Sequence, residues 1–261
     1  MKRLLLIFLA CALVAQVEGQ SIIRANPFAR AQVSGTVELH DSLDATAYYL
    51  HARFLYGDGS ATYMTDDGSV LTQWTDQSGD NNHIVNASGT DRPAKDAVNE
   101  EIDFDDTDDY LADGTFAYTQ PITIYMVVRI NTAANFDDLI RINSGTTGKI
   151  QIPDATNRTL RVFGGDSFFD TGNGFYPSAS YFILCVVFNN DVAGGSSIQV
   201  NGGSATTGTL ATASSDRIEL TTTTGANPGV SIKELIIRTT ADGSALRTAI
   251  INNLNSTYSV Y

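Results

Sequence analysis

The chain has 261 residues and a formal net charge of −13, from 16 basic against 29 acidic side chains. This acidic balance disfavours nucleic acids and anionic membrane surfaces as partners, because both repel a negatively charged protein. Hydrophobic residues make up 43% of the chain, enough for a sizeable core. All-β sandwiches of about 200–250 residues are routinely one domain, and we expect one domain here.

The first residues, 1–19, have the features of a secretory signal peptide. Lys2-Arg3 is a short positive segment, and the 11 residues Leu4–Val14 are apolar. This run is too short to span a bilayer comfortably, and no later stretch is apolar enough to do so. We therefore expect cleavage after Gly19, a secreted protein and no membrane insertion. A lipoprotein signal ending at Cys11 is the less favoured alternative.

Residues 20–46 lack clear periodicity and are interpreted as a linker, an edge strand or an arm that contacts other copies. The folded domain is expected over residues 47–261. Its first predicted strands are Tyr48–Leu55 and Val70–Trp74, with glycine-rich turn signals between them.

Two long apolar runs, Ile122–Ile130 and Tyr181–Phe188, are the strongest strand predictions. Their β-branched and aromatic residues, with almost no polar interruption, are typical of central strands covered on both faces. Cys185, inside the second run, is interpreted as a buried packing residue. Further strands are predicted at Phe136–Ile142, Lys149–Ile152, Thr159–Phe163, Ser197–Val200, Arg217–Leu220 and Ser231–Arg238.

A single helix is predicted near the C-terminus, over Ser244–Leu254. Ser244 is a suitable N-cap, and Leu246, Ile250 and Leu254 fall on one face of the helix. Short strands with Gly and Asn turns, followed by one helix, indicate an all-β sandwich.

Three segments in this order resemble the laminin-G/concanavalin-A-like jelly-roll family: Trp74–His83, Phe104–Leu111 and Asn252–Tyr261. The family pattern is Trp-x-Asp-x-Ser-Gly-x-x-x-His, then Phe-Asp-Gly-x-Asp-Asp-Tyr-Leu, then a closing helix ending Leu-Asn-x-x-Tyr. Two departures, Asp80 and Asp106, alter the loops. The resemblance implies a two-sheet antiparallel jelly-roll sandwich with one short C-terminal helix.

The resemblance also implies that Tyr258 and Tyr261, after the closing helix, pack against the edge of the sandwich. It leaves function open, because domains of this family bind glycans, cleave glycans or build extracellular and virion surfaces.

A glycosidase interpretation depends on Glu101 and Asp103. Glycosidases of the concanavalin-A-like fold carry Glu-x-Asp-x-(x)-Glu on one strand, where alternation places both glutamates on one face. Here Asp105 or Asp106 takes the last place and is one methylene shorter. We therefore assign no catalytic residue and expect that the protein is not an enzyme.

A serine triad from Asp76, Ser78 and His83 is also disfavoured, because all three lie within eight residues and no nucleophile elbow surrounds Ser78. Asp76 and Ser78 are expected to shape a turn. The single tryptophan, Trp74, is expected in the core.

The acidic loop is the candidate metal site, through Asp105, Asp106, Asp108 and Asp109. Clustered carboxylates with backbone carbonyls supply the oxygen ligands that Ca²⁺ takes. The alternative is structural: Asp108 or Asp109 would cap a turn by accepting hydrogen bonds from nearby backbone amides.

A glycine-rich segment, Gly164–Tyr176, is the candidate ligand-binding site. Aromatic faces suit the C–H faces of sugars, and amides or carboxylates suit their hydroxyls. A loop packed over one sheet is an equal alternative. The candidate ligand-binding residues are Phe168, Asp170, Asn173, Phe175 and Tyr176.

The leading functional prediction is a non-catalytic extracellular recognition or adhesion module for carbohydrate or another surface polymer. The alternative is a structural surface or fibre protein of a bacteriophage virion, with other virion or surface proteins as partners. A glycan hydrolase or lyase is the third hypothesis. Polymer-binding modules and fibres often gain avidity from multiple copies, so a homo-oligomer is compatible with the first two.

Overall fold

The computed structural model describes residues 50–55, 64–67, 70–86, 89–113, 118–143, 145, 147–190, 192–222 and 227–261. All of them belong to one structural unit, Thr36–Tyr261. The predicted signal peptide, 1–19, the predicted arm, 20–46, and the first residues of the predicted domain lie outside the described ranges. Within those ranges, no helix has both the length and the apolar character needed to cross a membrane.

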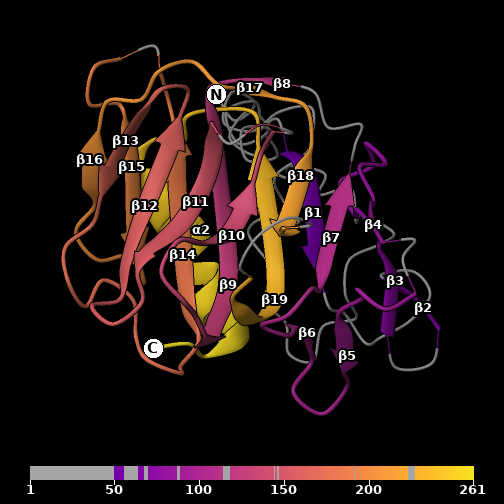
Figure 1. Ribbon diagram of the computed structural model, residues 1–261. Helices are drawn as coiled ribbons and strands as arrows, with labels where there is room; N and C mark the ends of the chain where they lie inside the picture. The colour runs from indigo at the N-terminus through magenta and orange to yellow at the C-terminus, as the bar shows by residue number, and fades with distance from the viewer. Residues whose placement is uncertain are drawn as a thin grey trace, which may run out of the picture. The chain divides into compact units, whose positions relative to one another are not determined.

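Strands dominate the described residues, and one helix, α2 (Ser244–Tyr258), closes the chain (Figure 1). The strands are β1 (Leu50–Leu55), β2 (Met64–Asp67), β3 (Val70–Trp74), β4 (Ile84–Val85), β5 (Ala94–Asp96), β6 (Glu101–Phe104), β7 (Tyr110–Asp113), β8 (Tyr118–Thr119), β9 (Ile122–Thr132), β10 (Asp137–Arg141), β11 (Gly148–Asp154), β12 (Thr159–Gly164), β13 (Ser167–Asp170), β14 (Phe182–Phe188), β15 (Ser196–Val200), β16 (Thr206–Gly208), β17 (Ser214–Ser215), β18 (Ile218–Thr221) and β19 (Gly229–Arg238).

Seventeen of these strands pair antiparallel into one connected sheet, while β8 and β17 pair separately. One run of pairs is β16-β15-β14-β9-β19, and β19 continues to both β1 and β6. The other run is β13-β12-β11-β10-β18-β7-β4-β3-β2. The pair Val70–Ala94, between β3 and β5, joins the two runs. The predicted all-β fold with a C-terminal helix is thus confirmed, although all 17 strands form one continuous network.

Both faces of β9 are covered, which explains its nearly unbroken apolar sequence. Ile124, Met126 and Val128 lie in the main core, whereas Tyr125 and Val127 belong to a second cluster with α2. Each face supplies apolar area that folding removes from water, at about 25 cal/mol per Å². The two strongest strand predictions, at β9 and β14, are therefore confirmed as central strands.

Helix α2 packs its buried residues Ile250, Ile251 and Leu254 against the outer face of β14 and β9. The predicted helix is confirmed, but its predicted cap is wrong. Gly243 is the N-cap, in an extended conformation without a side-chain hydrogen bond, and Ser244 is already the first helical residue.

The two closing tyrosines differ. Tyr258 is partly buried in the cluster under α2, and its hydroxyl donates a 2.7 Å hydrogen bond to Glu234. Tyr261 is 56% exposed. The expected packing is confirmed for Tyr258. Tyr261 follows the left-handed residue Ser259, which ends the helix, and its amide and carbonyl hydrogen-bond the Asn255 side chain at 2.9 and 3.0 Å. Its hydroxyl would lie 3.6 Å from a Cβ added at Gly202, in the turn after β15.

Candidate functional site

The predicted ligand-binding segment is divided between two places. Phe168 and Asp170 lie on β13, where Asp170 accepts hydrogen bonds of 2.5 and 2.7 Å from Arg161 on β12. The same guanidinium lies 4.1 Å from the ring centroid of Phe168, which is 51% exposed. These two residues thus form a surface patch on a hairpin with their arginine partner.

The loop after β13 packs against a different part of the fold. The Gly174 amide donates to the carbonyl of Asn157 at 2.7 Å, and the Phe175 amide donates to the carbonyl of Arg158 at 3.1 Å. Phe175 packs against the core, and Asn173 is exposed. The five predicted residues therefore do not share one surface.

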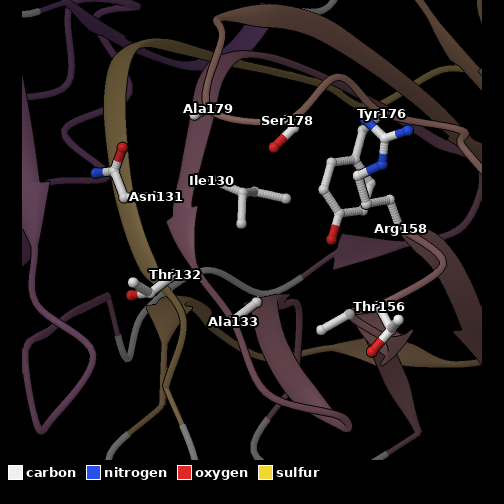
Figure 2. Close-up of a pocket in the computed structure, with 10 residues that line it drawn as sticks. Ile130, Asn131, Thr132, Ala133, Thr156, Arg158, Tyr176, Ser178 and Ala179 are labelled. Atoms are coloured by element: carbon white, nitrogen blue, oxygen red, sulfur yellow. The ribbon is translucent and has the colours of Figure 1, made fainter.

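Tyr176, the last of the five, forms one wall of a pocket of about 480 Å³ (Figure 2). The pocket lies where the end of β9 meets the turn between β11 and β12 and the loop before β14. Four of its lining residues are apolar: Ile130, Ala133, Ala155 and Ala179. The six polar lining residues are Asn131, Thr132, Thr156, Arg158, Tyr176 and Ser178.

The turn that carries Thr156 and Arg158 is braced by Asp154. Its carboxylate accepts hydrogen bonds from the Asn157 amide at 2.9 Å and the Asn157 side chain at 2.7 Å, and these bonds lower the pKa of Asp154. Arg158 follows with a left-handed φ of 53°, a conformation that non-glycine residues adopt rarely and at a cost in energy. The bracing therefore holds Arg158 at the pocket in a fixed backbone conformation.

Arg158 is the charged member of the pocket lining, and among the described residues its guanidinium has neither an ion pair nor a side-chain hydrogen bond. Figure 2 places it beside the ring of Tyr176. Burial raises the pKa of Tyr176 despite the nearby Arg158 charge, so the phenol stays protonated and can donate. The pocket therefore offers hydrogen-bond donors and hydroxyl acceptors suited to a polyhydroxylated ligand.

Sequence reasoning found Tyr176 but missed the other polar lining residues. Asn131 and Thr132 lie at the end of β9, a strand that was predicted from its apolar residues. Thr156 and Arg158 lie in a turn that follows Thr132 by more than 20 residues. The one local signal was Asp154-x-x-Asn157, a side-chain-braced turn.

The predicted metal residues form a tight turn. Asp105 accepts hydrogen bonds from the amides of Thr107 and Asp108 at 2.9 and 3.2 Å, and Asp109 accepts one from the amide of Asp105 at 2.8 Å. The structural alternative is thus confirmed for Asp109. Asp105, Asp108 and Asp109 have carboxylate oxygens within 4.8 Å of one another, whereas Asp106 lines a neighbouring cavity. Metal binding by this turn stays a prediction.

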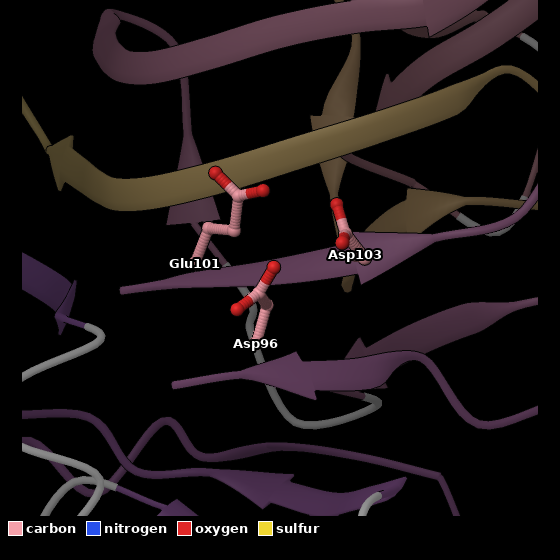
Figure 3. Close-up of side chains that lie close together, drawn as sticks. All are labelled: Asp96, Glu101 and Asp103. Atoms are coloured by element: carbon pink, nitrogen blue, oxygen red, sulfur yellow. The ribbon is translucent and has the colours of Figure 1, made fainter. Parts of the chain in front are cut away.

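The carboxylates of the glycosidase interpretation lie on the face of β6 where Glu101, Asp103 and Asp96 of β5 converge, with oxygens within 4.8 Å of one another (Figure 3). Glu101 is fully buried and accepts a 2.8 Å hydrogen bond from Arg129. Burial, and then the charge of Asp103, raises the pKa of Glu101. This arrangement could hold a proton or a cation. It is linked to the pocket lining through Ser231, whose hydroxyl donates to Asp103 and accepts a 2.9 Å hydrogen bond from Asn131.

The loop after Trp74 is shaped as expected. The Ser78 hydroxyl donates to Asp76 at 2.7 Å, and the Asp76 amide donates to His83 Nδ1 at 3.1 Å. These bonds fix a turn. Trp74 is fully buried in the main core.

The comparisons with known proteins identify a fold. No protein-family model and no curated protein matches the chain. Among solved structures, the chain is similar to the binding domain of botulinum neurotoxin serotype G, with a TM-score of 0.57 and 13% identity over 80% of this chain and 52% of that one. It is also similar to a GH54 α-L-arabinofuranosidase, with a TM-score of 0.55 and 15% identity over 74% of this chain and 51% of that one.

A third similar structure is the Trypanosoma rangeli sialidase, with a TM-score of 0.55 and 12% identity over 80% of this chain and 33% of that one. The chain thus spans about half of the first two proteins and a third of the sialidase. At these identities the likeness shows a shared β-sandwich type of fold alone.

These likenesses correct one prediction. From the incomplete carboxylate pattern at Glu101 and Asp103, the protein was expected not to be an enzyme. Two of the three similar structures are glycosidases. The exclusion of catalysis is therefore wrong, since this fold occurs both in glycosidases and in a toxin's receptor-binding domain.

Proposed function

We propose that the protein binds carbohydrate, and that the pocket lined by Thr132, Thr156, Arg158, Tyr176 and Ser178 holds a sugar unit. The observation that carries this proposal is the polar lining of a cavity of about 480 Å³. Small-molecule pockets are typically about 300–1,000 Å³, with a few placed polar groups that fix the orientation of the ligand.

The chemistry of the lining supports a sugar over an apolar ligand. Hydroxyls of Thr132, Thr156 and Ser178 both donate and accept hydrogen bonds, as sugar hydroxyls do. Ile130 and the small side chains of the three lining alanines offer an apolar surface for the C–H faces of a sugar ring. Arg158 and Tyr176 supply donors for ring or carboxylate oxygens.

The comparisons are consistent with this proposal, because the similar structures include a toxin receptor-binding domain and two glycosidases. We also propose that the domain is a jelly roll of the concanavalin-A-like type. The two runs of paired strands would form its two layers, and the Val70–Ala94 pair would join them at one edge.

The predicted signal peptide supports a secreted protein, whose targets would be extracellular glycans or another surface polymer. Several copies would increase the avidity for such a polymer, so a homo-oligomer suits this role.

The test is binding of the purified protein and two arginine variants to a broad glycan array. Arg158→Ala removes the charged group of the pocket, while Arg161→Ala makes the same change on the β12–β13 surface. We expect saturable binding by the wild type and by Arg161→Ala, with a weaker signal for Arg158→Ala. Loss confined to Arg161→Ala would move the site to the Phe168–Asp170 patch. A wild type that binds no glycan would contradict the proposal and favour the virion-surface alternative.

A further inference from the structure

Arg158 differs from every other basic side chain that the structure describes, because those side chains all have an oxygen partner. This pairing is expected in a chain with 29 acidic and 16 basic residues. Carboxylates pair with Lys95, Arg129, Arg141, Lys149, Arg161, Arg217 and Arg238. Backbone carbonyls accept hydrogen bonds from Arg92, Lys233 and Arg247. An unpaired guanidinium at the pocket is therefore exceptional in this acidic chain.

The backbone of the pocket lining is strained at two non-glycine residues. Arg158 has a φ of 53° and Ala179 a φ of 51°. Such conformations persist only where surrounding contacts enforce them, and they gather at ligand-binding sites. At Arg158 the amide donates to the carbonyl of Ala155 at 3.3 Å, and the carbonyl accepts from the amide of Phe175 at 3.1 Å. These contacts enforce the backbone conformation that brings the guanidinium to the pocket.

The guanidinium lies between Tyr176 and the loop that precedes it. Figure 2 shows it beside the Tyr176 ring, and a Cβ added at Gly174 would lie 3.7 Å from one of its Nη atoms. The hydroxyls of Thr156, Tyr176 and Ser178 line the same pocket, and each can donate a hydrogen bond. An anionic group beside Arg158 would therefore meet a positive charge and neutral donors together.

The carboxylates near this pocket limit the negative charge that it can hold. Asp137 and Asp154 both act on the phenol of Tyr176 through their charge, although neither lines the pocket. Asp137 is buried, and the Asn157 side chain and amide occupy Asp154. Because like charges repel, a ligand with one carboxylate suits the pocket better than a phosphorylated or densely sulfated one.

We propose that the pocket selects acidic sugars, and that Arg158 binds the carboxylate of a uronic acid unit. The inference rests on the proposed sugar site and adds the class of sugar. The planar guanidinium fork matches the two oxygens of a carboxylate, and charge-assisted hydrogen bonds are about twice as strong as neutral ones. The chain as a whole, with a net charge of −13, repels anionic polymers. A preference for the acid therefore has to come from this local contact.

The test is calorimetric binding of the purified protein to four forms of a tetrasaccharide in the gluco, galacto and manno series. The forms are the neutral hexose, the uronic acid, its methyl ester and the 6-O-sulfated hexose. They differ only at C6, so the ratio of their affinities isolates the effect of the charge. Arg158→Gln removes the positive charge, and Arg158→Lys keeps it without the planar fork. Arg161→Gln is the matched control outside the pocket.

We expect the wild type and Arg161→Gln to bind the uronic acid of one series at least about tenfold more tightly than its methyl ester. In Arg158→Gln the two affinities should agree within about twofold, with Arg158→Lys between these limits. The ratio compares two ligands on one variant, so a general loss of stability does not change it. Thermal unfolding confirms that each variant is folded.

Equal binding of the acid, the ester and the neutral form by the wild type would overturn the inference and leave the sugar site standing. A preference for the sulfated form would overturn the assignment to a carboxylate. A preference for the acid that survives in Arg158→Gln would overturn the role of Arg158. Absence of binding to all the tetrasaccharides would also overturn the inference, whereas the broad glycan array decides the proposed function separately.

Discussion

The rings of Tyr176 and Phe182 stack with their centroids 5.8 Å apart and their planes at 22°. Phe182 is fully buried at the start of β14, whereas Tyr176 also lines the pocket. One side chain thus belongs to the core through its ring and contributes to the pocket wall. This wall of the pocket is therefore built on the packed core, which limits the conformational entropy that the protein loses when a ligand binds.

Tyr176→Phe separates these two roles. The ring stack is kept, so the Tm should stay within about 2 °C of the wild type, equivalent to less than about 1 kcal/mol in the free energy of unfolding. Loss of one hydrogen bond to the ligand should weaken glycan affinity about 3- to 10-fold. Calorimetry with the strongest glycan from the array measures this. An unchanged affinity would mean that the hydroxyl does not contact the ligand.

Helix α2 is predicted to hold the outer face of β9 and β14 together. Leu254→Ala should lower the free energy of unfolding by about 2–5 kcal/mol, because it empties a fully buried site. Asn252→Ala, an exposed position on the same helix, should change it by less than about 0.5 kcal/mol. Urea denaturation of both variants checks this, and equal losses would show that the helix does not pack as described.

Replacing Arg129 or Arg161 with alanine should lower the free energy of unfolding by different amounts, because their carboxylate partners differ in burial. Arg129→Ala leaves Glu101 buried and without its 2.8 Å ion pair, and should cost about 2–4 kcal/mol. Arg161→Ala leaves Asp170 in solvent and should cost less than about 1 kcal/mol. Urea denaturation of the two variants measures this. A lower urea midpoint for Arg161→Ala than for Arg129→Ala would contradict the buried ion pair between Arg129 and Glu101.

Asp109 should make stability depend on pH. Burial raises its pKa from the ordinary 3.8 to about 6, so between these values the folded chain keeps a proton that the unfolded chain has lost. Protonation of Asp109 therefore favours the folded state. Its contribution to the free energy of unfolding is fully present below about pH 4 and is lost as the pH rises to 6. Each unit of pKa shift corresponds to about 1.4 kcal/mol.

Asp109→Asn removes this titration, because an amide cannot ionise. The free energy of unfolding of the variant, relative to that of the wild type, should rise by on the order of 2 kcal/mol between pH 4 and pH 6. It should not rise further above pH 6. Urea denaturation at pH 4, 5, 6 and 7 measures the difference. A difference that stays constant over this range would mean that Asp109 titrates alike in both states.

Most of the fold was predicted from the hydropathy pattern of the sequence, and the structure explains why this was possible. The apolar runs of β9 and β14 are covered on both faces, and the predicted strands from Val70 onward end within two residues of the observed ones. Short strands such as β13 and β16 were not predicted, because two to four half-exposed residues carry no periodicity. The N-cap was misplaced because Gly243 makes no side-chain cap for a sequence pattern to reveal.

The candidate site was predictable only in part, for a physical reason. The aromatic residues of the segment Gly164–Tyr176 led to the prediction of Tyr176. However, Phe168 is held on β13 by its pairing with β12, whereas Tyr176, eight residues later, lies in the loop that follows. The partners of Tyr176 come from β9 and from the turn at Thr156 and Arg158. Their convergence depends on strand pairing between residues far apart in sequence, which no local pattern encodes.

The most direct test of the carbohydrate pocket is to fill it. Thr156 is an exposed residue of the lining, so Thr156→Trp should occupy the cavity without disturbing the core. Thr207→Trp, at an exposed position of β16, is the matched control. Calorimetry with the strongest glycan from the array should show binding by the wild type and Thr207→Trp and none by Thr156→Trp, with similar Tm values for all three. Undiminished binding by Thr156→Trp would contradict the assignment of the sugar to this pocket.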